Sequence, residues 1–205
     1  MKSCAKDGRL LLGLISAHIL LYITYHNTSV FWYLYTASML FCVSIAMASE
    51  KSKDNESSLA KNIIYGLLSG ILVYALFALG NALIQWLDIS TLSKDVAQLY
   101  KKFSPVDAWH FLVLFLVIIP AEEIFWRGFI QKRIGQYISN KATIIASALL
   151  YALPLIYSQN LALIIAGIAA GAVWAALYQW KKSLPLVIMS HLIFDYLLLV
   201  LLPFK

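Results

Sequence analysis

Long apolar runs, separated by short polar stretches, follow one another from residue 10 almost to the end of the chain. A helix needs about 20 apolar residues to cross roughly 30 Å of hydrocarbon. The runs that are long enough, or nearly so, lie at 10–25, 30–48, 62–87, 108–131, 142–157, 161–180 and 184–202. The pattern predicts an all-α, polytopic transmembrane bundle of about seven spanning helices, in which the first and fifth are short for a span.

The composition agrees with an integral membrane protein and disfavours other classes. Hydrophobic residues make up 61% of the 205 residues and charged residues 13%, with a mean hydropathy of +0.78, which lies outside the soluble globular range. The net charge of +6 does not indicate a nucleic-acid partner, because the basic residues are scattered in short loops beside the apolar runs. Cys4 and Cys42 form no spaced pair of a disulfide framework or metal site. We expect no cofactor and no metal.

The distribution of basic residues predicts the orientation in the membrane. Threading the chain alternately from a cytoplasmic N-terminus leaves four of the 16 Lys and Arg residues outside, and the rest lie on or near the cytoplasmic side. The four are Lys94, Lys101, Lys102 and Lys205. This bias is the one that the positive-inside rule requires, so we expect the C-terminus outside. The expected location is a bacterial cell membrane.

Two polar connections suggest how the chain is divided. Residues 50–61 have the composition of a flexible cytoplasmic loop, and they would separate two N-terminal helices (1–61) from a five-helix region (62–205). The outer connection, 88–107, mixes charges with apolar residues at near-helical spacing. It predicts a short amphipathic helix on the outer interface.

Three charged residues, Glu122, Glu123 and Arg127, interrupt the fourth apolar run. A charge at mid-bilayer costs at least about 2.5 kcal/mol, so such residues indicate a functional site by default. Glu123 and Arg127 are four apart and can pair on one helix face, whereas Glu122 is rotated by about 100° and lacks that partner. We expect Glu123 to stay ionised and hold the helix, and Glu122 to be the carboxyl group that moves protons.

The seventh run adds His191 and Asp195, again four apart. Helix rise places Glu122, His191 and Tyr151 each about 14–15 Å from the basic residues that end their helices on the cytoplasmic side. They can therefore meet at one level, and we predict that they line one cavity open to the cytoplasmic side. Pro154, just beyond Tyr151, should bend its helix or loosen the backbone hydrogen bonding.

Several other features favour a structural interpretation. His18 and His110 each stand alone in or near an apolar stretch, which is typical of packing or interfacial residues. Gly167 and Gly171 lie among alanines on a small-residue face, which indicates close helix packing rather than a substrate groove. A His–Asp pair such as that of the seventh run is as often a structural pair as a catalytic one, and the matching depth favours the catalytic reading.

At these charged positions the sequence resembles the CPBP family of intramembrane proteases, also called the Abi family, which includes the type II CAAX prenyl endopeptidases and bacteriocin self-immunity proteins. Glu122, Glu123 and Arg127 meet the signature Glu-Glu-x-x-x-Arg, and His191 and Asp195 meet the signature His-x-x-x-Asn/Asp. The resemblance covers about 108–202. It implies an endopeptidase in which the first glutamate activates water and the last motif stabilises the oxyanion. It also implies a membrane-associated peptide or protein substrate, prenylated in the CAAX branch.

One position departs from the family pattern. The middle signature is Phe-x-x-x-His, and here Tyr151 and Leu155 stand at its two ends. Leucine cannot hold a water molecule, and Asp195 can donate to an oxyanion only if it is protonated. Two interpretations follow: a divergent protease in which Tyr151 or a second water contact replaces the histidine, or an inactive pseudo-protease that acts as a membrane binding or immunity protein.

We favour the protease. A zinc hydrolase is less well supported because no His-Glu-x-x-His is present, and a proton-coupled transporter is less well supported because no paired repeats or broken half-helices are found.

Overall fold

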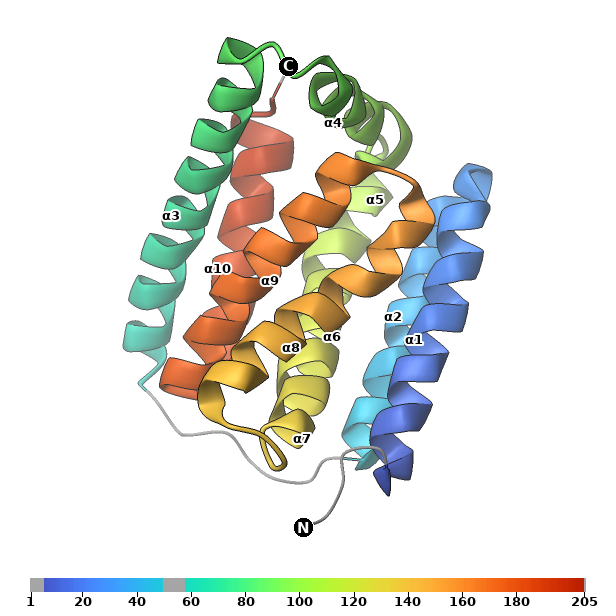
Figure 1. Ribbon diagram of the computed structural model, residues 1–205, viewed down its shortest axis with the longest axis vertical. Coiled ribbons are helices and arrows are strands. Elements are labelled where there is room, and N and C mark those ends of the chain that lie inside the picture. Colours follow the sequence, from blue (N-terminus) through green and yellow to red (C-terminus); the bar gives the residue numbers. More distant parts are fainter. Residues whose placement is uncertain (1–5, 50–57, 205) are drawn as a thin grey trace.

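The computed structural model describes residues 6–49 and 58–204, and within these ranges all regular structure is helical (Figure 1). Seven helical segments of this part are long and apolar enough to cross a membrane. They are α1 (Gly8–His26), η2 with α2 (Thr28–Ser49), α3 (Leu59–Trp86), a fourth span (Ala108–Ile134), a fifth (Asn140–Ser158), α9 (Leu161–Lys181) and a seventh (Leu184–Leu201). The predicted all-α polytopic bundle is confirmed. Cys4 and most of the 50–61 connection lie outside the described residues, and the division at residue 61 stays a prediction.

Besides the second span, which begins with the 3₁₀ turn η2 (Thr28–Val30), three spans are not uniform α-helices. The fourth consists of α5 (Ala108–Val113), the π-helical η3 (Leu114–Ile118), α6 (Ile119–Glu123), the π-helical η4 (Ile124–Gln131) and α7 (Lys132–Ile134). The fifth changes from α8 (Asn140–Ala152) to a 3₁₀ segment, η5 (Leu153–Ser158), at Pro154, as expected for a residue that cannot donate to the ladder. The seventh changes from α10 (Leu184–Tyr196) to the π-helical η6 (Leu197–Leu201). Irregular turns of this kind are frequent at functional sites.

The predicted amphipathic segment forms α4 (Ser90–Phe103), which covers the end of the bundle where the C-terminus lies (Figure 1). Asp95 ties α4 to α9, since its carboxylate accepts from the N–H groups of Leu161 (2.8 Å) and Ala162 (3.4 Å). Tyr100 ties it to the seventh span by donating to the carbonyl of Leu198 (3.0 Å). The helix is confirmed, and its place at the outer membrane surface stays a prediction.

Glycines bring pairs of helices close together around the centre of the bundle. A Cβ on Gly66 would lie 2.6 Å from Cβ of Met189, and one on Gly70 would lie 2.6 Å from the carbonyl oxygen of Ser190, so α3 packs tightly against α10. On α9, a Cβ on Gly171 would lie 3.0 Å from the ring of Tyr151. Gly171 therefore lies on a packing surface, as predicted, but the prediction fails for part of the face, because Ala166, Gly167, Ala169 and Ala170 line a cavity.

His18 and His110 have structural surroundings, in agreement with the sequence. His18 Nδ1 lies 3.0 Å from the hydroxyl of Tyr157, which joins α1 to η5. His110 Nδ1 accepts from the backbone N–H of Asp107 (3.1 Å) at the start of the fourth span, and its ring stacks on Trp32.

At the opposite end from α4, Asp7 connects the start of α1 to the end of the fourth span. Its carboxylate accepts from Leu10 N–H (3.2 Å) and the Tyr137 hydroxyl (3.0 Å) and pairs with Arg133 (3.3 Å). Burial alone would raise the pKa of Asp7, but these hydrogen bonds and the Arg133 charge together lower its pKa below the usual value.

Candidate active site

The charged residues of the fourth span lie where its geometry changes. Glu122 and Glu123 end α6, and Arg127 lies within the π-helical η4 that follows. Tyr151 is in the last turn of α8, and His191 and Asp195 are in α10. The structure brings all six residues predicted from the sequence into one region, from three different spans. Because lipid cannot solvate such groups, their convergence inside the bundle is what a membrane site requires.

Glu123 is the centre of a buried charge cluster. Its side chain is 0% exposed, and Oε1 accepts from Arg127 Nη1 at 3.1 Å and contacts His191 Nδ1 at 2.7 Å. Arg127 also donates to the carbonyl of Gly171 (3.4 Å), and its guanidinium lies 4.5 Å from the ring centroid of Tyr151. The predicted Glu123–Arg127 pair is therefore present. Its extension to His191 links the fourth span to the seventh.

Glu122 has different partners. Its Oε1 accepts a hydrogen bond from the hydroxyl of Tyr35, which comes from α2, and its Oε2 accepts from the hydroxyl of Tyr151 at 3.4 Å. Oε2 also lies 4.0 Å from His191 Nε2. The two adjacent carboxyl groups thus have separate environments: one is bound to two basic side chains, and the other is held by two phenols.

His191 is oriented from two sides. Its ring stacks on Trp174 with 3.8 Å between centroids, and its Nδ1 is bound to Glu123. Nε2 is left facing Glu122 and Asp195, whose Oδ2 lies 3.7 Å away. These distances are too long for hydrogen bonds. Nε2 is consequently directed at a space between two carboxyl groups, where a small polar group can bind.

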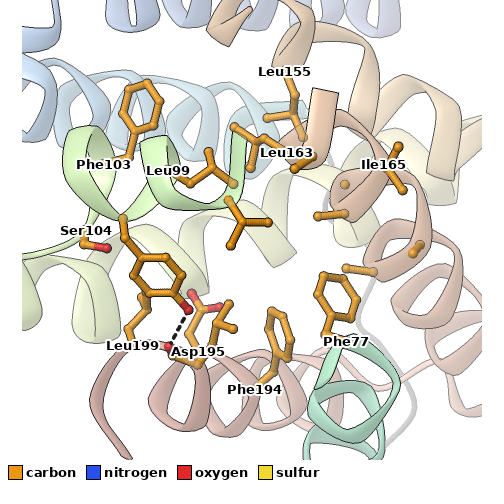
Figure 2. Close-up of a pocket in the computed structure, with 18 of the residues that line it drawn as sticks. Phe77, Leu99, Phe103, Ser104, Leu155, Leu163, Ile165, Phe194, Asp195 and Leu199 are labelled. Atoms are coloured by element: carbon orange, nitrogen blue, oxygen red, sulfur yellow. Dashed lines mark hydrogen bonds between the residues drawn. The ribbon is translucent and has the colours of Figure 1, made fainter. Parts of the chain in front are cut away.

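Glu122, Tyr151, His191 and Asp195 line a cavity of about 510 Å³. Apolar side chains supply most of the remaining wall, among them Phe77 from α3, Leu99 from α4, Leu163 from α9 and Phe194 from α10; Figure 2 shows them lining the cavity together with Asp195. Within the described residues, no group of three or more His, Cys, Asp and Glu side chains is arranged to hold a metal ion.

The expected opening toward the basic loops is wrong. The lining residues come from α4 and from the parts of α2, α3, α9 and α10 that lie nearest α4, which is the other end of the bundle (Figure 1). On the side of the basic loops the interior of the bundle holds the side chains of Arg127, Gln131 and Tyr178, each at most 1% exposed. Helix rise correctly predicted that Glu122, Tyr151 and His191 meet. It carries no information on whether side chains fill the bundle above or below that level.

Two residues of the site were not predicted, Tyr35 and Trp174. Both are uncharged aromatic residues, and a tyrosine near the start of a span is usually an interfacial anchor. No spacing in the sequence connects them to the charged residues. Leu155, at the position of the family histidine, lines the same cavity and is 8% exposed.

Comparison with known families gives a match that covers the segment containing the charged motifs. Residues 104–197 match the family model described as type II CAAX prenyl endopeptidase Rce1-like, and this segment contains both charged motifs. The match supports the resemblance to the CPBP proteases, and this part of the chain, which lies largely within candidate membrane spans, is similar to that protease family. No curated protein and no solved structure gives a significant match to the chain.

Proposed function

We propose that the protein is an intramembrane endopeptidase in which Glu122 activates water to cleave a peptide bond of a membrane-associated substrate. The observation that carries the proposal is the separation of roles between the two glutamates. Glu123 is bound to Arg127 and His191, whereas Glu122 lies in the cavity wall with His191 Nε2 at 4.0 Å. A carboxyl group that faces a cavity, and whose nearest basic atom lies beyond hydrogen-bond distance, is suited to act as a general base.

The proposed reaction follows from these contacts. Glu122 takes a proton from a water molecule, the resulting hydroxide attacks the carbonyl carbon, and the negative charge develops on the carbonyl oxygen. Glu122 then returns the proton to the amide nitrogen as the carbon–nitrogen bond breaks. His191 Nε2 faces the site where the oxyanion would form, and donors of this kind are commonly worth about 3–4 kcal/mol.

The protonation of His191 has a structural consequence. An ionised Glu123 only accepts, so the proton of their hydrogen bond belongs to Nδ1. For Nε2 to donate as well, the ring must be an imidazolium, and Glu123 is then its counter-ion. Glu123 would then both pair with Arg127 and balance the charge of His191.

Leu155 is the feature that favours the alternative, a membrane binding or immunity protein that does not cleave. The position of Tyr151 supports the protease, because its hydroxyl reaches Glu122 from the same segment in which the family histidine would lie. A divergent protease with a phenol in place of an imidazole is therefore the interpretation that we prefer.

The proposal extends to the substrate and the location. A cavity of about 510 Å³ with a mostly apolar wall suits a substrate with a long apolar group, such as a prenyl chain.

The predicted orientation, with a cytoplasmic N-terminus in a bacterial cell membrane, is supported by the basic residues Arg133, Lys181 and Lys182 at the end of the bundle opposite α4.

The test is cleavage of a panel of membrane-anchored peptides, with and without a prenyl group, by the purified protein in vesicles. Glu122→Gln keeps the shape and removes the base, and Asp88→Asn removes an exposed carboxylate away from the site as a matched control. We expect cleavage by the wild type and Asp88→Asn, and none by Glu122→Gln at equal abundance. Partner binding that persists in Glu122→Gln, with no cleavage by any form, would establish the binding protein instead.

A further inference from the structure

Tyr35 contacts the proposed base from outside the region that matches the family. The match begins at residue 104, whereas Tyr35 lies in α2, and its hydroxyl donates to Glu122 Oε1. Its side chain also lines the cavity. The N-terminal helices thus reach the site directly, although the Rce1-like segment holds both of its charged motifs.

We infer that Tyr35 is a positioning residue which, together with Tyr151, holds the Glu122 carboxylate in the orientation needed to activate water, in place of the histidine that Leu155 replaces. This inference rests on the proposed protease function. Under this inference one residue of the site, Tyr35, comes from α2, which contains neither charged motif.

The packing of α2 explains why Tyr35 points inward. Phe31, one turn earlier, lies 5.2 Å from the Tyr35 ring and 4.8 Å from the ring of Phe103 in α4. Trp32 stacks on His110 at the start of the fourth span, with 4.8 Å between centroids. These contacts hold the first turns of α2 against both neighbours. A tyrosine that served as an interfacial anchor would direct its hydroxyl to water, whereas this one is directed at a carboxyl group inside the bundle.

The two phenols act on different oxygens of the same carboxylate. Tyr35 binds Oε1 and Tyr151 binds Oε2, so rotation about the last side-chain bond of Glu122 would break both hydrogen bonds. A carboxylate can accept about four hydrogen bonds, which leaves lone pairs for a water molecule. Donors to the ionised form also stabilise it relative to the neutral acid. The pair therefore supplies orientation and charge stabilisation without a histidine at position 155.

The first experiment compares Tyr35→Phe with Tyr33→Phe. The first substitution keeps the ring and deletes the hydroxyl; the second makes the same change on an exposed side chain of the same helix, 65% exposed. We expect kcat of Tyr35→Phe to fall about ten- to hundredfold with little change in KM, since a hydrogen bond to a charged group is lost. The acid limb of the kcat–pH profile should move to higher pH, because the ionised carboxylate has lost a donor. Tyr33→Phe should match the wild type in both respects.

A second variant covers the case in which Tyr35→Phe does not fold. Incorporating 3-fluorotyrosine at position 35 keeps the ring and the hydroxyl but makes the hydroxyl a stronger donor. The acid limb should then move to lower pH. A purely structural Tyr35 would change abundance and thermal stability in Tyr35→Phe, yet would leave the pH profile of the folded fraction unchanged in both variants.

The outcomes separate the two proposals. If the wild type cleaves and Glu122→Gln does not, the protease function stands. An unchanged kcat and pH profile in Tyr35→Phe would then overturn the role of Tyr35 alone. If the wild type cleaves no substrate in the panel, the protease function fails, and the positioning role fails with it.

Discussion

Replacing Glu123 by alanine should destabilise the protein far more than replacing its neighbour Glu122. The Glu123→Ala variant leaves the Arg127 guanidinium, 1% exposed, without its counter-charge and leaves His191 Nδ1 without its acceptor. Breaking a buried ion pair by removing one partner costs about 3–5 kcal/mol. Glu122→Ala instead removes the acceptor of two phenols, a cost of about 1–3 kcal/mol, and water in the cavity can replace part of it.

The assay is thermal unfolding in detergent, combined with the amount of protein recovered from membranes. For a chain of this length, about 2–4 °C of melting temperature corresponds to 1 kcal/mol, so Glu123→Ala should melt about 6–20 °C below the wild type. Glu122→Gln, which keeps the volume and one of the two acceptor oxygens, is the control and should stay within a few degrees of the wild type. Equal losses in Glu123→Ala and Glu122→Ala would refute the separation of roles and show one structural unit.

Three further outcomes are expected. Leu155→His should raise the cleavage rate, because it puts an imidazole into the cavity wall beside the base; a loss of stability with no gain in rate would favour the binding protein. Asp95→Ala should cost about 1 kcal/mol through loss of the cap on α9 and speed hydrogen exchange in α4, whereas Asp95→Asn should retain most of the protection. The lowered pKa of Asp7 means that its hydrogen bonds with Leu10 and Tyr137, together with its pairing with Arg133, stabilise the fold above about pH 4. That contribution should disappear as the pH falls further, and Asp7→Asn should lack this dependence in pH-dependent unfolding.

The bilayer made much of the fold predictable. Its thickness sets the length of a spanning helix, so apolar runs gave all seven segments, and near-helical spacing of apolar residues gave α4. The Glu123–Arg127 pair could be predicted from the sequence because both residues lie on one helical span, four positions apart. The contact between Glu123 and His191 joins residues 68 positions apart, and only the packing of α10 decides which glutamate His191 meets.

The remaining features depend on shape rather than on residue type. Tyr35 is an uncharged residue in an aromatic stretch, and its inward direction comes from the contacts of Phe31 and Trp32 with other helices. The side on which the cavity lies depends on how Gln131 and Tyr178 fill the opposite half. Neither the inward direction of Tyr35 nor the side on which the cavity lies produces a periodic pattern or a charged position in the sequence. A sequence pattern therefore could not predict them.

The π-helical segment η4 has a mechanical consequence for the site. Arg127 and Gln131 each donate to a carbonyl of α9 that lies 44 residues further along the chain, at Gly171 and Ala175. The equal offset shows that the two spans run in the same direction and are locked in register. Sliding one past the other would break both bonds at once, in a buried region where water cannot replace them. These two bonds therefore oppose a piston-like motion between the fourth span and α9. Widening of the cavity without loss of these bonds would come from displacement of the other helices that line it, such as α3 and α4.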